Sequence, residues 1–217
     1  MKKILFLCIA LAAAATGFSQ ARFGIKGGVN LANQKVSVEV MGFGVSQDGD
    51  GIVGFHLGGV AEFPMGRHFA FRPELLFTGK GANMNVSFDD EEEETSKAKI
   101  RPYYLELPLN LVYGYNLASG TRLFLGGGPS LAYGLFGKIK SQGQSEDVFQ
   151  DEGFKNFDLG LNILAGVQLT SGLTFSINYT PGLSNIYNGA EDLEDMIKMK
   201  WKNTVVGFSV GYMFARK

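Results

Sequence analysis

The chain has 217 residues, enough for one domain of ordinary size or two small ones, and 45% of them are hydrophobic. Its 20 Lys and Arg residues nearly balance its 21 Asp and Glu residues, which excludes a polybasic nucleic-acid-binding protein, a disordered tail and a helical membrane protein with long apolar runs. The 30 Gly, 18 Phe and 8 Tyr residues, without a collagen repeat, favour many β-strands over helices.

The first segment has the pattern of a secretory signal. Lys2 and Lys3 precede an apolar run at 4–15, and a polar stretch ends at Ser19-Gln20-Ala21. The run is shorter than the roughly twenty residues that a membrane-spanning helix needs, so an uncleaved anchor helix is the less favoured alternative. We predict a cleaved signal peptide over 1–20 and a single domain over 21–217, which contains no cysteine because Cys8 lies in the signal.

From residue 22 onward, apolar and polar residues alternate with a period of two, which is typical of β-strands. In the segment 103–113, for example, Leu105 and Leu107 share one face, whereas Glu106 and Asn110 share the other. The same alternation predicts eight strands, at 22–33, 53–63, 69–80, 103–113, 122–133, 157–169, 173–180 and 203–214.

The connections between these strands alternate in length. The segments 64–68, 114–121 and 170–172 are short, whereas 34–51, 81–99, 137–156 and 182–202 are long and polar. An even number of strands with short turns at one end and long loops at the other is typical of a barrel of the bacterial outer membrane. We therefore predict an all-β, eight-stranded antiparallel up-and-down transmembrane β-barrel with short periplasmic turns and four long outer loops, located in the cell outer membrane.

The bulky apolar face of each strand is predicted to point outward into lipid, because an eight-stranded barrel holds only a modest set of side chains. Tyr103 and Tyr113, ten residues apart on one strand, would stand about 25 Å apart along the membrane normal, which is the height of the apolar band between two aromatic girdles. The first and last strands should pair, since an unpaired backbone group in hydrocarbon is costly. The predicted aromatic girdle comprises Phe23, Phe63, Phe69, Phe77, Tyr103, Tyr113, Tyr133, Phe157, Tyr179, Tyr212 and Phe214.

The opposite face carries a predicted polar network in the lumen, made of Lys26, His56, Glu62, Arg72, Glu74, Glu106, Asn110 and Asp158. We interpret it as a charge-paired plug, with pairs such as Arg72 and Glu106, because buried charges need partners. The alternative is a proton relay or an ion-conducting path. No spacing of nucleophile, base and orienting group is found around His56, so we predict no catalytic residue, cofactor or metal site and no enzymatic activity.

Three features of the long loops carry weaker signals. The acidic run Asp89, Asp90, Glu91, Glu92, Glu93 and Glu94 could hold Ca²⁺ or meet a cationic partner, or it is simply a solvated loop. The segment 48–51 resembles the start of a calcium loop but lacks the remaining ligands, so we interpret it as a turn. An acidic start and a basic end suggest a short amphipathic helix at 191–198, packed over the barrel mouth.

Several motifs occur in a fixed order. Gly24-Ile25-Lys26-Gly27-Gly28-Val29-Asn30-Leu31 follows the signal, Tyr104-Leu105-Glu106-Leu107-Pro108-Leu109 lies in the fourth predicted strand, Gly126-Gly127-Gly128-Pro129 in the fifth, and Gly211-Tyr212-Met213-Phe214 in the last. Together they resemble the PorT-like or "porin family" outer-membrane barrels of Bacteroidetes. The resemblance covers the whole mature chain and implies the same fold, in a family of which many members have no assigned activity. Ala215-Arg216-Lys217 depart from it, because barrels handled by the assembly machinery usually end on an aromatic residue.

From these observations we expect an integral outer-membrane protein with no catalytic role, which serves as a scaffold, adhesion or surface-interaction protein. The alternatives are a narrow porin or small-solute channel, and a component of a secretion or envelope-assembly system, which only the family name suggests. The expected partners are outer-membrane lipid, the barrel-assembly machinery during biogenesis and an unidentified surface or envelope partner. We expect a monomer that binds no nucleic acid.

Overall fold

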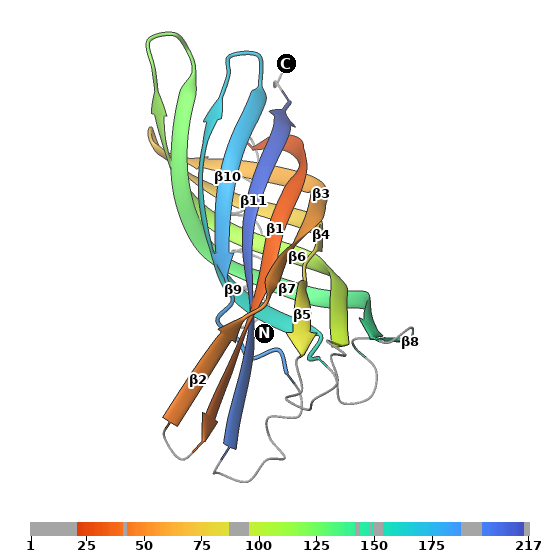
Figure 1. The fold of residues 1–217 in the computed structure, drawn as a ribbon. Helices are drawn as coiled ribbons and strands as arrows, with labels where there is room; N and C mark the ends of the chain where they lie inside the picture. Colours follow the sequence, from red (N-terminus) through yellow and green to blue (C-terminus); the bar gives the residue numbers. More distant parts are fainter. Residues whose placement is uncertain are drawn as a thin grey trace, which may run out of the picture.

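Eight antiparallel strands form a closed barrel (Figure 1). The computed structural model describes residues 21–40, 43–86, 96–141, 144–147, 149, 154–187 and 197–214. The barrel strands are β1 (Arg22–Val40), β3 (Asp50–Met65), β4 (Phe69–Gly79), β6 (Ser96–Asn116), β7 (Arg122–Ser141), β9 (Phe157–Gln168), β10 (Leu173–Pro181) and β11 (Ile197–Met213). Each pairs with the next in chain order, and β1 pairs with both β3 and β11.

The predicted pairing of the first and last strands is confirmed. Gly24 of β1 lies opposite Met213 of β11, and the ladder continues as far as Val40 opposite Ile197. This pairing closes the ring, so the backbone groups of the wall find partners within the protein, as a hydrocarbon environment requires.

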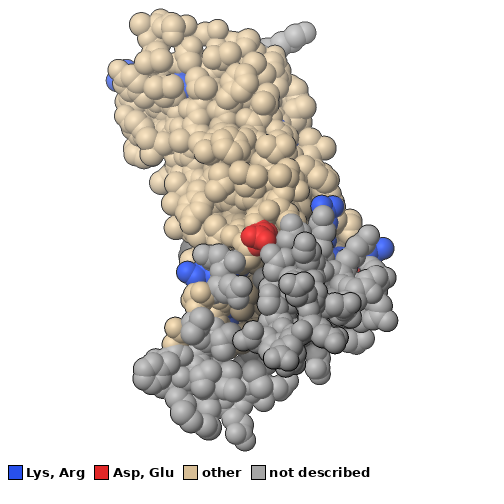
Figure 2. Space-filling model, in the orientation of Figure 1, with Lys and Arg blue, Asp and Glu red and all other residues tan. Residues whose placement is uncertain are grey.

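The prediction that apolar side chains face outward is also confirmed. Phe55, Leu107 and Ile163 are 46%, 36% and 50% exposed, whereas their sequence neighbours His56, Glu106 and Asn162 are buried. Figure 2 shows the result, because Lys, Arg, Asp and Glu are missing from most of the visible wall and gather near its two ends. Large apolar groups on the outside and charged groups on the inside are the arrangement of a barrel that lipid surrounds.

Three short turns join strands at one end of the barrel, where the C-terminus also lies (Figure 1). Each turn contains one glycine with a positive φ, namely Gly66 (82°), Gly120 (81°) and Gly172 (92°). Residues with a side chain rarely adopt this conformation, so glycine permits these tight reversals. We call this the short-turn end and the opposite one the outer end.

The long connections contain more strand than the alternation predicted. β1 continues to Val40, and β6 starts at Ser96. There are also three further strands: β2 (Phe43–Asp48) pairs with β1, β5 (Ala82–Val86) pairs with β6 and β3, and β8 (Gln144–Asp147) pairs with β7. Beyond the membrane a strand needs no apolar face, so its ladder can continue where the hydrophobic alternation has stopped.

The predicted helix at 191–198 is wrong at its end, because Ile197 and Lys198 belong to β11. Four segments lie outside the described residues: the rest of that predicted helix at 191–196, the acidic run 89–94, the predicted signal 1–20 and the terminal residues 215–217. Across the described ranges, no helix is long and apolar enough to cross a membrane.

Candidate functional site

The structure places all eight residues of the predicted polar network inside the barrel, each at most 8% exposed. The predicted network left out further buried polar residues that follow the same alternation. Lys80 and Asn203 lie on the polar face of the predicted strands 69–80 and 203–214, whereas Gln34 begins a segment interpreted as a loop. The additional buried polar residues are Asn30, Gln34, Thr78, Lys80, Ser130, Asn162, Thr174, Thr180, Asn203 and Ser209.

At the short-turn end, one carboxylate serves three arginines. Glu62 accepts hydrogen bonds from Arg22 and from Arg122, whose Nη1 lies 2.7 Å from Oε1. The Nε atom of Arg72 lies 3.7 Å from Glu62 Oε2, and its guanidinium lies 4.6 Å from the centre of the Phe124 ring. The three cations come from β1, β4 and β7, so this cluster ties distant parts of the wall together.

The predicted pairing of Arg72 with Glu106 is therefore wrong. On the β4–β6 ladder Arg72 lies opposite Asn110, whereas Glu106 lies opposite Leu76, four residues further along β4. Alternation assigns both side chains to the lumen but does not determine their heights, which depend on the register between the strands.

The middle of the lumen holds hydrogen-bonded polar groups. Lys26 Nζ lies 2.6 Å from Glu74 Oε2. His56 Nδ1 lies 2.7 Å from Asn30 Oδ1, and its Nε2 lies 2.7 Å from Ser209 Oγ. The adjoining cavity has a volume of about 20 Å³, which is room for a single water molecule.

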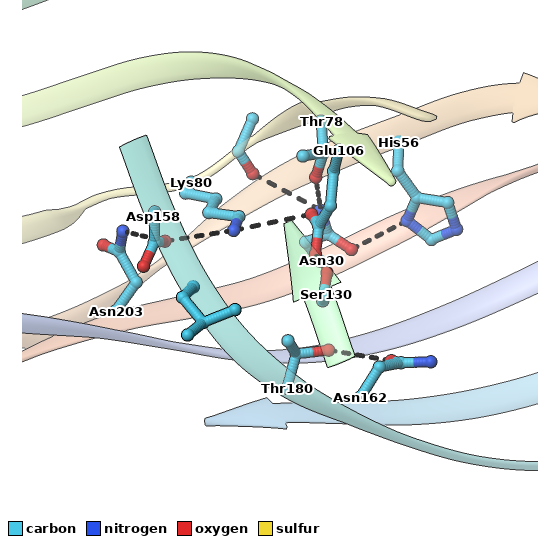
Figure 3. Close-up of polar contacts among 12 residues, drawn as sticks. Asn30, His56, Thr78, Lys80, Glu106, Ser130, Asp158, Asn162, Thr180 and Asn203 are labelled. Carbon is cyan, nitrogen blue, oxygen red and sulfur yellow. Dashed lines mark hydrogen bonds and ion pairs between the residues drawn. The ribbon is translucent and has the colours of Figure 1, made fainter. Parts of the chain in front are cut away.

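Near the outer end, a chain of polar contacts crosses the lumen (Figure 3). Lys80 Nζ lies 3.3 Å from Asp158 Oδ2 and 3.5 Å from Glu106 Oε2. Ser130 donates to Glu106 at 2.6 Å, and Asn203 donates to Asp158 at 2.9 Å. These residues come from β6, β7, β9 and β11 and from the position just after β4, so the contacts link distant parts of the wall across the lumen.

Charge is unevenly distributed along the lumen of the described barrel. Three arginines surround Glu62 at the short-turn end, whereas Lys80 faces two carboxylates toward the outer end. Between them, Lys26 is paired with Glu74.

An apolar cluster lies at the outer end of the described barrel, next to this network. Ile100, Phe154 and Ile186 are buried together, with Phe149 and Trp201 packed against them. We call these five residues the outer cap. The Trp201 ring meets the Phe154 ring edge-on at 4.9 Å, and its Nε1 donates to Gln34 at 3.2 Å.

The side chain of Asn185 anchors the outer cap. Its Nδ2 donates to the backbone oxygen of Met199 at 2.9 Å, and its Oδ1 accepts from the Trp201 backbone N–H at 2.8 Å. The sequence carried only a faint signal for the cap, namely isolated large apolar residues in polar segments.

The eleven aromatic residues of the predicted girdle occupy outward-facing positions, but because β6 and β7 extend beyond the predicted strands, Tyr103 and Tyr133 lie within strands and not at their ends. At the outer end, the Phe77 and Tyr103 rings are stacked with their centres 5.6 Å apart, and Phe55 adjoins Phe77 at 5.9 Å. At the short-turn end, Phe69 meets Tyr113 edge-on at 5.4 Å.

The geometry of the lumen bears on two kinds of chemistry, metal binding and nucleophilic catalysis. In the part of the chain that the structure describes, no group of three or more His, Cys, Asp or Glu could hold a metal ion. Ser209, His56 and Asn30 have the connectivity of a nucleophile, a base and an orienting group, which the sequence concealed because they lie on three different strands. All three are at most 5% exposed, and the adjoining cavity has no room for a substrate.

Comparison with known proteins gives one family match. A model described as "Outer membrane protein beta-barrel domain" matches residues 15–188, and no curated protein matches the chain. The outer membrane protein OprG of Pseudomonas aeruginosa has a similar structure, with a TM-score of 0.52 and 14% identity over 90% of this chain and 97% of OprG. This likeness shows the fold alone.

Two other solved structures are more distant. Neisserial surface protein A gives a TM-score of 0.45 at 13% identity, covering 88% of this chain and 97% of its own. The attachment invasion locus protein Ail of Yersinia pestis, solved with the heparin analogue sucrose octasulfate, gives 0.35 at 16% identity, covering 88% and 99%.

Proposed function

The chain belongs to the family of outer membrane protein β-barrel domains, and from that premise we propose that it is a barrel with a closed lumen that acts as a non-catalytic scaffold or surface-interaction protein. The observation that carries this proposal is the interlocked lumen. Lys80 is paired with Glu106 and Asp158 toward its outer end, Glu62 is paired with the arginines at its short-turn end, and the cavity beside Lys26 and His56 has a volume of about 20 Å³, which suits a single water molecule.

The outer cap supports the same proposal. Trp201 and Phe154 pack over the polar network, and a solute that entered from outside would first have to displace this apolar cluster. A barrel closed at its outer mouth and filled in its middle leaves its outer surface as the part that can meet a partner. The acidic run 89–94, which we propose as that contact surface on sequence grounds, belongs to one of the outer connections.

Planar-bilayer recording tests the closed lumen. We expect no large, stable conductance from the purified protein. As a matched control, a Trp201→Ala, Phe154→Ala variant, which lacks the two rings in edge-on contact in the outer cap, should also remain closed, because the network around Lys80 lies below the cap. Large, stable conductance of the unaltered protein would contradict the proposal and favour the narrow porin.

The absence of catalysis is tested at Ser209, the best-placed nucleophile. We expect a fluorophosphonate probe to leave Ser209 unlabelled in the folded protein, because the residue is buried and its hydroxyl is hydrogen-bonded to His56 inside the lumen. Labelling that disappears in His56→Ala would favour a hydrolase.

We also propose, from the sequence motifs given above, that the chain is a PorT-like barrel of the Bacteroidetes kind that carries a cleaved signal.

Co-purification of periplasmic or secreted proteins with the intact barrel would favour the envelope-assembly role over the scaffold. If deletion of 88–96 left all surface and partner binding unchanged, the acidic run would lose its proposed role.

A further inference from the structure

Outside the lumen, β6 and β7 carry two cations side by side. Arg101 lies directly opposite Lys138 on the β6–β7 ladder, and both side chains are exposed. Like charges directly opposite each other destabilise a sheet, with Cβ atoms only about 5 Å apart. Asp147 of β8 lies opposite Lys138, but its Oδ1 accepts from the Phe149 backbone N–H, and neither cation forms an ion pair with a described residue. Both cations are therefore exposed and open to an anion from outside the barrel.

Two aromatic rings lie directly beneath this cation pair. Two residues further into the wall along each strand, Tyr103 lies opposite Phe136, and the ring centres are 5.1 Å apart. Phe77 packs against both rings, at 5.6 Å from Tyr103 and 6.2 Å from Phe136. Aromatic rings of this kind mark the boundary between hydrocarbon and headgroups, so Arg101 and Lys138 stand at the level of the lipid headgroups.

A β-bulge creates this arrangement. On β7, Tyr104 pairs with Gly134 but Tyr103 pairs with Phe136, so Leu135 is an extra residue without an opposite partner. Uninterrupted alternation after Tyr133 would turn Phe136 and Lys138 inward, whereas the bulge turns both outward. Bulges commonly re-aim side chains at functional sites, and this one builds the cation pair and the ring pair together.

We propose that Arg101, Lys138, Tyr103 and Phe136 form a binding site for a phosphate-bearing lipid of the outer leaflet. The phosphate lies between the two cations and accepts charge-assisted hydrogen bonds, for which the fork of the arginine is well shaped. The first part of an acyl chain lies on the rings of Tyr103 and Phe136. The site is independent of whether the lumen conducts, because all four side chains point away from it.

The barrel contains a matched control pair. Lys35 of β1 lies directly opposite Lys202 of β11, again on the outward face near the outer end. Two residues further into the wall, the corresponding positions hold Asn33 and Thr204 instead of rings. This pair has the same charge but lacks the aromatic platform.

The experiment reconstitutes the full chain in vesicles of a phosphate-free galactolipid that contain lipid A, with lipid A stripped of its phosphates as the comparison. Retained lipid is counted by native mass spectrometry. We expect Arg101→Gln, Lys138→Gln to weaken retention of lipid A roughly thirtyfold, the scale that two surface cations provide, and Tyr103→Leu, Phe136→Leu to weaken it less. Arg101→Lys should keep most binding, and added inorganic phosphate should not displace the lipid.

Three results would overturn the proposal. An equal loss in Lys35→Gln, Lys202→Gln would mean that surface charge attracts the lipid without a defined site. Equal retention of dephosphorylated lipid A would mean that phosphate is not recognised, and displacement by inorganic phosphate would point to a site for the free anion. If the Arg101→Gln, Lys138→Gln variant does not fold, the single variants Arg101→Gln and Phe136→Leu test the cation and the ring separately.

Discussion

Lys80 offers a direct test of whether charge holds the lumen together. Its ammonium group lies 3.3 Å from Asp158 and 3.5 Å from Glu106, and it is buried. At an effective dielectric constant of about 20, Coulomb's law gives about 5 kcal/mol for each contact. Part of this attraction is offset by the removal of the charges from water, so the net effect of losing the cation is smaller than the gross sum.

We expect Lys80→Met to lower the free energy of unfolding by about 3–5 kcal/mol, because it leaves two carboxylates buried without their shared cation. The assay is urea unfolding in phosphatidylcholine vesicles, followed through the emission of Trp201, the single tryptophan of the chain. Adding Glu106→Gln and Asp158→Asn to the same variant should restore most of the loss, since no unpaired charge then remains. The exposed Lys200→Met serves as the control and should change stability by less than about 0.5 kcal/mol. If Lys80→Met matched this control, the network would not be a charge-paired plug.

Three further experiments test the wall, the closure and the cap. Gly58→Ala should destabilise the barrel by about 1–3 kcal/mol in the same assay, because its Cβ would meet a backbone carbonyl oxygen of β4, whereas Gly59→Ala, whose nearest atom is 4.0 Å away, should be nearly neutral. A disulfide between Val29→Cys and Phe208→Cys, which lie directly opposite each other on β1 and β11, should form under mild oxidation and block the gel shift on heating; a failure to form would contradict the closure. Trp201 emission should be blue-shifted and poorly quenched by acrylamide, and ready quenching would mean that the outer cap is open.

The fold could be predicted because membrane insertion constrains every strand in the same way. Residues such as Phe55 and Leu107 had to face lipid, so the alternation repeated on all eight strands. The closure of β1 on β11 followed from the cost of unpaired backbone groups in hydrocarbon, which needs no knowledge of contacts.

The contacts inside the barrel could not be predicted in the same way. Alternation determines the face of Arg72 and Glu106, but their partners depend on the register between strands, which no local pattern of the sequence encodes. The bulge at Leu135 reverses the alternation of β7, so the outward position of Lys138 was also hidden. Outside the membrane no apolar face is required, so the ends of the strands carry no alternation of apolar and polar residues from which they could be predicted.

The separation of charge along the interior has an electrical consequence. Cations dominate near the short-turn end and carboxylates near the outer end, inside a wall surrounded by low-dielectric lipid that screens them poorly. A mobile ion admitted by an opened variant would therefore meet a built-in potential gradient. Current through such a variant should rectify, with one voltage polarity passing more current than the other, and the preferred direction would report which way the barrel sits in the bilayer.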